Sequence, residues 1–233
     1  MSQIILNVLC EGQTEDRFAN SVLKGHLKNF GIVVKTTILV TNKKKNIRGG
    51  ILSYQQAKND LELLIKQHSK KTYEKHFYTT MFDLYALPND FPGYTDAMKI
   101  PDCYAVTKKI EDEFGKDINH HLFIPYIQLH EFEALVFCGL EHLLIDYPDM
   151  TKQIEELKKV LKNYTDNPEK INNSPVTAPS KRIIKAFESK HHYDKPKSGE
   201  LVTQRVGIPL LKEKCLHFRE WMESLEKIAI DEV

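Results

Sequence analysis

Short apolar runs alternate with amphipathic helical patterns over the first 137 residues, and this alternation limits the possible folds more than any other feature. Four runs have the length and composition of buried strands, at residues 4–10, 32–40, 76–82 and 122–129. Apolar residues recur at helical spacing between and after these runs, at residues 14–30, 53–67, 103–114 and 130–137. This order predicts an α/β fold in which a mainly parallel sheet is flanked by helices.

The sequence changes character after Gly139. Residues 140–233 show helical patterns without clear strands, and prolines interrupt them at intervals. We therefore expect an α/β domain at residues 1–139 and a helical C-terminal appendage at residues 140–233 that packs on it. The polar segment NKKKNIRGG, which follows the second predicted strand, is expected to be a loop.

Composition excludes several classes of protein. The chain has 33 Lys and Arg residues against 32 Asp and Glu residues, which argues against a protein that coats DNA but allows a local basic groove. Its four cysteines lack the spacing of a zinc site, so we expect reduced thiols. The first apolar stretch meets Glu11 too early for a signal peptide or a membrane span, and we expect a cytoplasmic protein without a membrane partner.

Acidic residues follow three of the predicted strands: Glu11 and Glu15 after the first, Asp83 after the third, and Glu131 and Glu133 after the fourth. Because parallel sheets bind ligands at the carboxyl ends of their strands, we expect these side chains to lie close together. Carboxylates repel one another unless a cation neutralises them, and hard oxygen ligands select Mg²⁺ or Mn²⁺. One such ion, or a pair, implies phosphoryl transfer or phosphodiester hydrolysis.

Structural roles are the alternative for each of these acids. Glu15 could simply complement the dipole of its helix, and Asp83 could cap a turn in the proline-rich loop that follows it. On a helix, Glu131 and Glu133 would diverge by about 200°, so we expect only one of them, Glu131, to reach a metal. The HEFEA segment starts like the zinc-protease motif HExxH but has alanine at the second histidine position, which excludes that site.

Five blocks of sequence, in this order, carry a resemblance: EGQTEDRF, TTMFDLYALPNDFPG, FIPYIQLHEFEALVF, INNSPVTAPSKR and YDKPKSG. Together they resemble a prokaryotic domain-of-unknown-function family with a Toprim-like fold, whose members occur in mobile and antiphage defence loci. Toprim domains are the metal-binding catalytic modules of topoisomerases, primases and overcoming-lysogenization-defect (OLD) nucleases. They are built around a Glu after the first strand and an Asp-x-Asp after the third.

The resemblance implies roles for particular residues. Glu11 stands at the first acidic position, Asp83 opens the second, and Glu15 resembles the extra acid in the EGxxE motif of OLD-type nucleases. Tyr85 replaces the second Asp of Asp-x-Asp. One metal position therefore lacks a ligand unless Asp90 or Glu131 supplies it, which leaves open whether the site holds one ion or two, and whether it is active.

Basic residues gather in two stretches. Residues 174–205 hold seven basic side chains against three acidic ones, with aromatic residues between them, which suits a nucleic-acid backbone. Lys181 and Arg182 follow Ser180, a candidate helix cap, so a helix N-terminus and two cations could meet one phosphate. Lys195 belongs to the same stretch. A solvated helix face is the alternative.

The second basic stretch is the NKKKNIRGG segment. Arg48 lies there beside two glycines that would let the backbone approach a ligand closely. A mobile surface loop is the alternative interpretation.

These observations predict a Mg²⁺- or Mn²⁺-dependent Toprim-like nuclease that acts on DNA or RNA. Its expected catalytic residues are Glu11, Asp83 and Glu131. The expected metal ligands are the same three with Glu15, and the expected phosphate-binding residues are Lys181, Arg182, Lys195 and Arg48. The alternatives are a non-catalytic module that binds nucleic acid or a partner ATPase, and a hydrolase of small phosphate esters. The sequence has no Walker A or GxGxxG motif, so we expect no ATP or dinucleotide site of those kinds in the chain itself.

Overall fold

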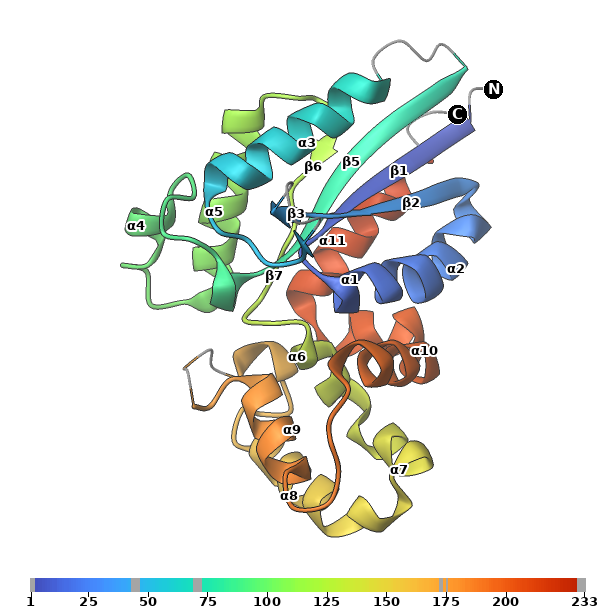
Figure 1. Cartoon of the computed structure of the whole chain (residues 1–233), viewed down its shortest axis with the longest axis vertical. Coiled ribbons are helices and arrows are strands. Elements are labelled where there is room, and N and C mark those ends of the chain that lie inside the picture. The colour runs from blue at the N-terminus through green and yellow to red at the C-terminus, as the bar shows by residue number, and fades with distance from the viewer. Residues whose placement is uncertain (1–2, 43–46, 69–72, 172–173, 175, 230–233) are drawn as a thin grey trace.

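A parallel sheet forms the centre of the α/β part of the molecule (Figure 1). The computed structural model describes residues 3–42, 47–68, 73–171, 174 and 176–229. The strands lie in the order β2-β1-β5-β6, and β7 pairs with the end of β5. Their bounds are β1 Gln3–Cys10, β2 Ile32–Ile38, β5 Glu74–Asp83, β6 Phe123–Ile124 and β7 Ile127–Gln128. Every pair in this sheet is parallel, which confirms the predicted fold class.

The register of the strands brings the predicted acidic positions to one edge. Cys10 at the end of β1 pairs with Met81 of β5, and Asp83 pairs with Gln128 of β7. The backbone N–H of Glu11 continues this pairing by donating to Met81 O at 3.0 Å. The chain therefore leaves all three strands at the same edge, with Glu11 and Asp83 beside each other.

Helices cover both faces of the sheet, because successive side chains of a strand point to opposite sides. Leu6, Val8 and Cys10 of β1 pack into one core with the helical segment 13–30, whereas Leu9 packs into a second core. The segment 13–30 consists of α1 Gln13–Phe18, a π-helical turn Ala19–Leu23, α2 Lys24–Leu27 and a 3-10 turn Lys28–Phe30. The second core contains residues of α3 Tyr54–His68, α4 Tyr94–Ala97 and α5 Cys103–Ile118.

The C-terminal region is helical, as expected. Its longer helices are α8 Thr151–Lys162, α9 Pro179–Phe187, α10 Lys195–Lys214 and α11 Leu216–Lys227. Short helical pieces precede and join them: α6 Glu133–Val136, α7 Leu143–Asp146 and 3-10 turns at Phe137–His142, Pro148–Met150 and Pro168–Lys170. Figure 1 shows α8 and α9 away from the sheet, whereas α10 packs on α1 and α11 lies against the sheet.

The apolar core runs across the predicted domain boundary. Trp221 of α11 donates from Nε1 to Thr79 Oγ1 of β5 at 2.9 Å, and Phe218 of α11 is buried in the same core as Leu6 of β1. α11 is therefore part of a helical layer on the sheet, and the division at residue 139 stays a prediction about folding units.

Several local predictions were wrong. Residues 122–129 form two strands of two residues each, separated at Pro125, instead of one strand. The helix expected from residue 130 begins only at Glu133, and the helix expected to be capped by Thr14 has Gly12 as its N-cap. The expected loop contains a short antiparallel hairpin of β3 Val40–Asn42 and β4 Ile47–Arg48.

Lysines 43–45 of the NKKKNIRGG segment lie outside the described residues, so the predicted basic cluster stays a prediction. Among the helices that the structure describes, none is long and apolar enough to cross a membrane. The cysteines are free thiols, and three of them, Cys10, Cys138 and Cys215, are buried.

Candidate functional site

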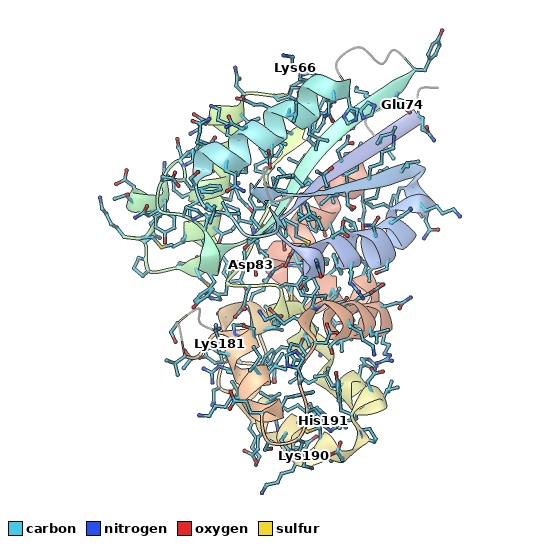
Figure 2. The ribbon with its side chains drawn as sticks, viewed as in Figure 1. Lys66, Glu74, Asp83, Lys181, Lys190 and His191 are labelled. Atoms are coloured by element: carbon cyan, nitrogen blue, oxygen red, sulfur yellow. The ribbon has the colours of Figure 1, made fainter. Side chains whose placement is uncertain are left out.

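Five carboxylates meet where the sheet joins the C-terminal helices (Figure 2 labels Asp83 there). We call them the carboxylate cluster: Glu11, Glu15, Asp83, Glu131 and Glu133. Glu11 follows β1 and Asp83 ends β5, and the backbone N–H of Asp83 donates to Glu11 Oε2 at 2.9 Å. The structure thus brings together the four acids predicted as metal ligands and adds a fifth.

Backbone amides hold four of these carboxylates in place. Each of the four accepts one such hydrogen bond: Glu11 from Asp83 at 2.9 Å, Glu15 from Gly12 at 2.9 Å, Asp83 from Phe132 at 3.0 Å, and Glu131 from Ser180 at 3.1 Å. The donors come from four separate parts of the chain, so the cluster depends on the tertiary fold. The bond from Ser180 also ties the first turn of α9 to the cluster.

One lysine lies against the cluster. The Nζ atom of Lys195 is 3.6 Å from Glu131 Oε2 and 3.4 Å from Glu133 Oε1. Lys195 is the first residue of α10, whose N-cap Asp194 accepts a bond from the Lys197 amide at 3.1 Å. The sequence predicted Lys195 as a phosphate ligand, whereas its ammonium here balances part of the carboxylate charge.

Burial makes the negative charge of the cluster unfavourable. It raises the pKa of Glu15 to about 7, with help from the neighbouring charge of Glu11. Burial likewise raises the pKa of Glu133 to about 7, although Lys195 opposes this change. The pKa of Asp83 lies well above its usual range for the same reason, reinforced by the four other acids. A cation in addition to Lys195 would therefore stabilise the ionised cluster strongly.

The donor set fits a hard divalent cation. Its ligand atoms are carboxylate oxygens, which Mg²⁺ and Mn²⁺ prefer. Glu133 Oε1 is fully buried without a well-formed hydrogen bond to any described residue, and the Lys195 ammonium is its ionic partner. Within the described part of the chain, no three acidic, histidine or cysteine side chains are already gathered tightly enough to hold an ion.

The prediction that only one of Glu131 and Glu133 could reach a shared cation rested on a helix that does not form there. His130 has a left-handed backbone with φ of 63°, and the helix starts after it. Both carboxylates consequently point to the same Nζ atom of Lys195. The sequence offers no clear signal for this turn, since only a few per cent of non-glycine residues adopt positive φ.

His130 itself is buried, and burial lowers the pKa of its imidazole to about 4. It is therefore neutral at physiological pH. Its backbone carbonyl accepts a bond of 2.8 Å from the amide of Tyr85, the residue that replaces the second Asp of the Toprim pattern. Asp90, a suggested replacement, instead accepts a bond of 2.9 Å from the amide of Tyr54 at the start of α3.

The remaining predicted phosphate ligands lie around the cluster. Lys181 is exposed on α9, and Arg182 donates from Nε to Thr177 O at 2.6 Å. The N-cap of α9 is Ala178, so the predicted cap Ser180 is wrong. The side chain of Arg48 lies outside the described residues, but its hairpin borders the cluster because the Gly50 amide donates to Glu11 O at 3.0 Å.

The fold and site define an α/β protein with a carboxylate cluster at the C-terminal edge of a parallel sheet. Residues 10–226 match the family described as Domain of unknown function (DUF4276), and the chain belongs to this family. The match confirms the expectation of a domain-of-unknown-function family. No match was found among curated proteins.

One solved structure is similar over the whole chain. It is the C-terminal region of the OLD protein of Xanthomonas campestris pv. campestris, with 15% identity and a TM-score of 0.43, covering 100% of this chain and 98% of that chain. Similarity at this level assigns no activity.

Proposed function

We propose that this protein is a Mg²⁺- or Mn²⁺-dependent, Toprim-like nuclease that hydrolyses phosphodiester bonds in DNA or RNA. The observation that carries the proposal is the convergence of five buried or half-buried carboxylates on one edge of the sheet, beside the Lys195 ammonium. The proposed ligands of the ion are Glu11, Glu15, Asp83 and Glu131. The structure adds Glu133 as a fifth candidate ligand. A bound divalent ion activates water and stabilises a leaving oxygen in such reactions.

The chain's own residues would position the reaction. Rigid strand ends and backbone amides fix the carboxylates, so little conformational freedom is lost when an ion binds. Glu131 and Glu133 supply carboxylates in place of the missing second Asp at Tyr85. Lys195 lies close enough to these acids for its ammonium to approach a phosphate bound at the same place.

The proposal is tested by replacing Glu11 and Asp83 with their amide isosteres. We expect Glu11→Gln and Asp83→Asn each to abolish divalent-dependent cleavage of oligonucleotides while the circular dichroism spectrum stays native. Each variant should also weaken Mn²⁺ binding, measured by titration calorimetry, because a neutral amide replaces a charged ligand. Glu213→Gln, at an exposed position of α10, is the matched control and should behave as wild type.

Equal cleavage by wild type and both variants would refute the catalytic assignment. Cleavage of mononucleotide esters without cleavage of polymers would instead identify a small phosphate-ester hydrolase.

A non-catalytic module is the second candidate, and one observation favours it. The Lys195 ammonium already lies 3.4 Å and 3.6 Å from two carboxylates, so it neutralises part of the cluster without a metal. Such a module would bind nucleic acid or a partner ATPase and show no metal-stimulated turnover. Co-purification with an ATPase would support it. A role in antiphage defence is supported by the family resemblance alone.

A further inference from the structure

The helices α8 and α9 enclose a groove of about 470 Å³ outside the carboxylate cluster. Leu157, Val160 and Ala186 form its apolar lining, and the basic side chains of Lys152, Arg182 and Lys185 line it as well. We call it the α8–α9 groove. Such a combination of apolar surface and cations is typical of surfaces that bind the backbone and bases of a nucleic-acid strand.

The lysines of this region fall into two groups. Lys152 and Lys185 in the groove, and Lys181 one helical turn before Lys185, form no salt bridge with another described residue. In contrast, two lysines of α8 outside the groove are paired: Lys158 with Glu155 at 3.2 Å and Lys159 with Glu156 at 2.7 Å.

The salt bridge to Lys159 matters for the groove, because Glu156 is the acidic residue among the groove's lining. Because Lys159, which lies outside the groove, balances the charge of Glu156, the groove keeps a positive potential. An anion would therefore be attracted there.

The helix α9, which lines one side of the groove, begins at the cluster. The amide of Ser180, in the first turn of α9, donates to Glu131 Oε1 of the cluster at 3.1 Å. Figure 2 shows Lys181 on the part of α9 nearer Asp83, with Lys190 and His191 beyond the other end. The 9 residues of α9 span about 13 Å, roughly the length of four phosphates along one strand of a duplex.

The positive surface does not continue past α9. A second hollow of about 500 Å³ is lined by Lys190 and His191, and Asp149 forms an ion pair with Lys190 at 3.4 Å and a hydrogen bond with His191 at 2.8 Å. Beyond α9, Lys190 therefore adds little unbalanced positive charge.

We propose that the α8–α9 groove binds the phosphate backbone of a nucleic-acid strand and leads that strand to the carboxylate cluster. Lys152, Lys181 and Lys185 contact successive phosphates, and Leu157, Val160 and Ala186 contact sugars or bases. The delivery of the strand to a cleavage site rests on the proposed function, whereas the binding itself does not depend on it.

The experiment measures binding without cleavage. Fluorescence anisotropy with labelled oligothymidylate and oligouridylate in EDTA compares wild type with the triple variant Lys152→Gln, Lys181→Gln, Lys185→Gln. We expect about 30-fold weaker binding of the triple variant at low salt, and a slope of log affinity against log salt that is smaller by about 2. Lys158→Gln, on α8 but outside the groove, should bind as wild type.

Several outcomes would overturn the proposal. Wild-type protein that binds neither oligonucleotide would refute it, as would a triple variant that binds as tightly as wild type. If the triple variant fails to fold, Lys185→Gln alone should still weaken binding about threefold, and no change would count against the groove. The two oligonucleotides distinguish DNA from RNA.

A second substrate separates this proposal from the catalytic one. Hydrolysis of bis(p-nitrophenyl) phosphate with Mn²⁺ needs no groove, so the double variant Lys152→Gln, Lys185→Gln should retain the wild-type rate. Loss of this activity in the double variant would place these two lysines in the chemistry of the cluster itself and refute the groove. If wild type shows no phosphodiesterase activity but its oligonucleotide binding depends on the lysines, the nuclease proposal is refuted and the binding proposal is supported.

Discussion

Lys195 places a single positive charge next to several carboxylates that are held there by backbone hydrogen bonds. Removing one partner of a buried ion pair leaves the other charge buried without compensation. This lowers the stability of the protein more than replacing both partners with apolar residues. The Lys195 side chain is 38% exposed, so solvent screens part of this effect.

We expect Lys195→Met to lower the free energy of unfolding by about 1–2 kcal/mol in EDTA at pH 8. Millimolar Mn²⁺ should then raise the melting temperature of the variant more than that of wild type, because the ammonium no longer competes with the ion. Lys197→Met, at an exposed position in the first turn of the same helix, is the control. Thermal denaturation gives the stability of wild type and of both variants. A Lys195→Met protein that is as stable as wild type, or whose melting temperature does not respond to Mn²⁺, would contradict the expectation.

At the scale of residues, the sequence predicts the cluster where a strand ends and fails where the backbone turns unexpectedly. Glu11 and Asp83 were found because each directly follows a run of apolar residues, and parallel strands end at a common edge. The pattern excludes Glu133 because it predicts a helix from residue 130, whereas the left-handed backbone of His130 places the start of that helix at Glu133. Lys195 reaches the cluster only through the packing of α10, which no local pattern encodes.

Gly199 lets α10 pack closely on the elements that carry the cluster. A Cβ atom there would lie 2.8 Å from Cε1 of the buried Phe132 ring and 3.2 Å from Cγ2 of Thr14 in α1. Phe132 lies between Glu131 and Glu133, and its amide bonds Asp83. A shift of the Phe132 ring would therefore move the backbone that positions Glu131, Glu133 and Asp83.

We expect Gly199→Ala to lower the free energy of unfolding by about 1–3 kcal/mol, because the added methyl overpacks this contact. Gly25→Ala is the matched control: Gly25 is exposed in α2, a Cβ there meets no atom within 4 Å, and alanine favours helix. The free energy of unfolding of this control should rise by up to about 1 kcal/mol. Urea unfolding of both variants provides the measurement. A Gly199→Ala protein that is as stable as wild type would show that α10 can shift freely on α1.

The elements themselves show which patterns are reliable. Buried strands and long amphipathic helices were predicted to within a few residues, as for β1 and α3, because their apolar periodicity is a local property. The start of α11 was not predictable in this way. Its first amides, from His217 and Phe218, both donate at 3.0 Å to Glu169, a buried carboxylate from a distant segment.

At the scale of the whole molecule, one apolar core joins the sheet to the C-terminal helices. Leu6 and Val8 of β1 share this core with Phe218 and Met222 of α11. A fragment ending at residue 139 would leave this face of the sheet exposed to water, which is strongly unfavourable. The sequence predicts a C-terminal region packed on the α/β domain, but it does not show which residues form the contact, because the change of pattern after Gly139 marks a change of secondary structure.

Trp221 makes the cooperativity of this core measurable, since it is the single tryptophan of the chain. Its ring stacks on Tyr126 with 4.0 Å between ring centroids, and its Nε1 bonds Thr79 in the sheet. Its fluorescence therefore reports the contact between α11 and the sheet, whereas far-UV circular dichroism reports all helices. If the shared core makes the chain unfold as one unit, the two signals should change at the same urea concentration. Independent domains divided at residue 139 would instead produce a second circular dichroism transition without a change in fluorescence, and that result would restore the boundary and contradict a single core.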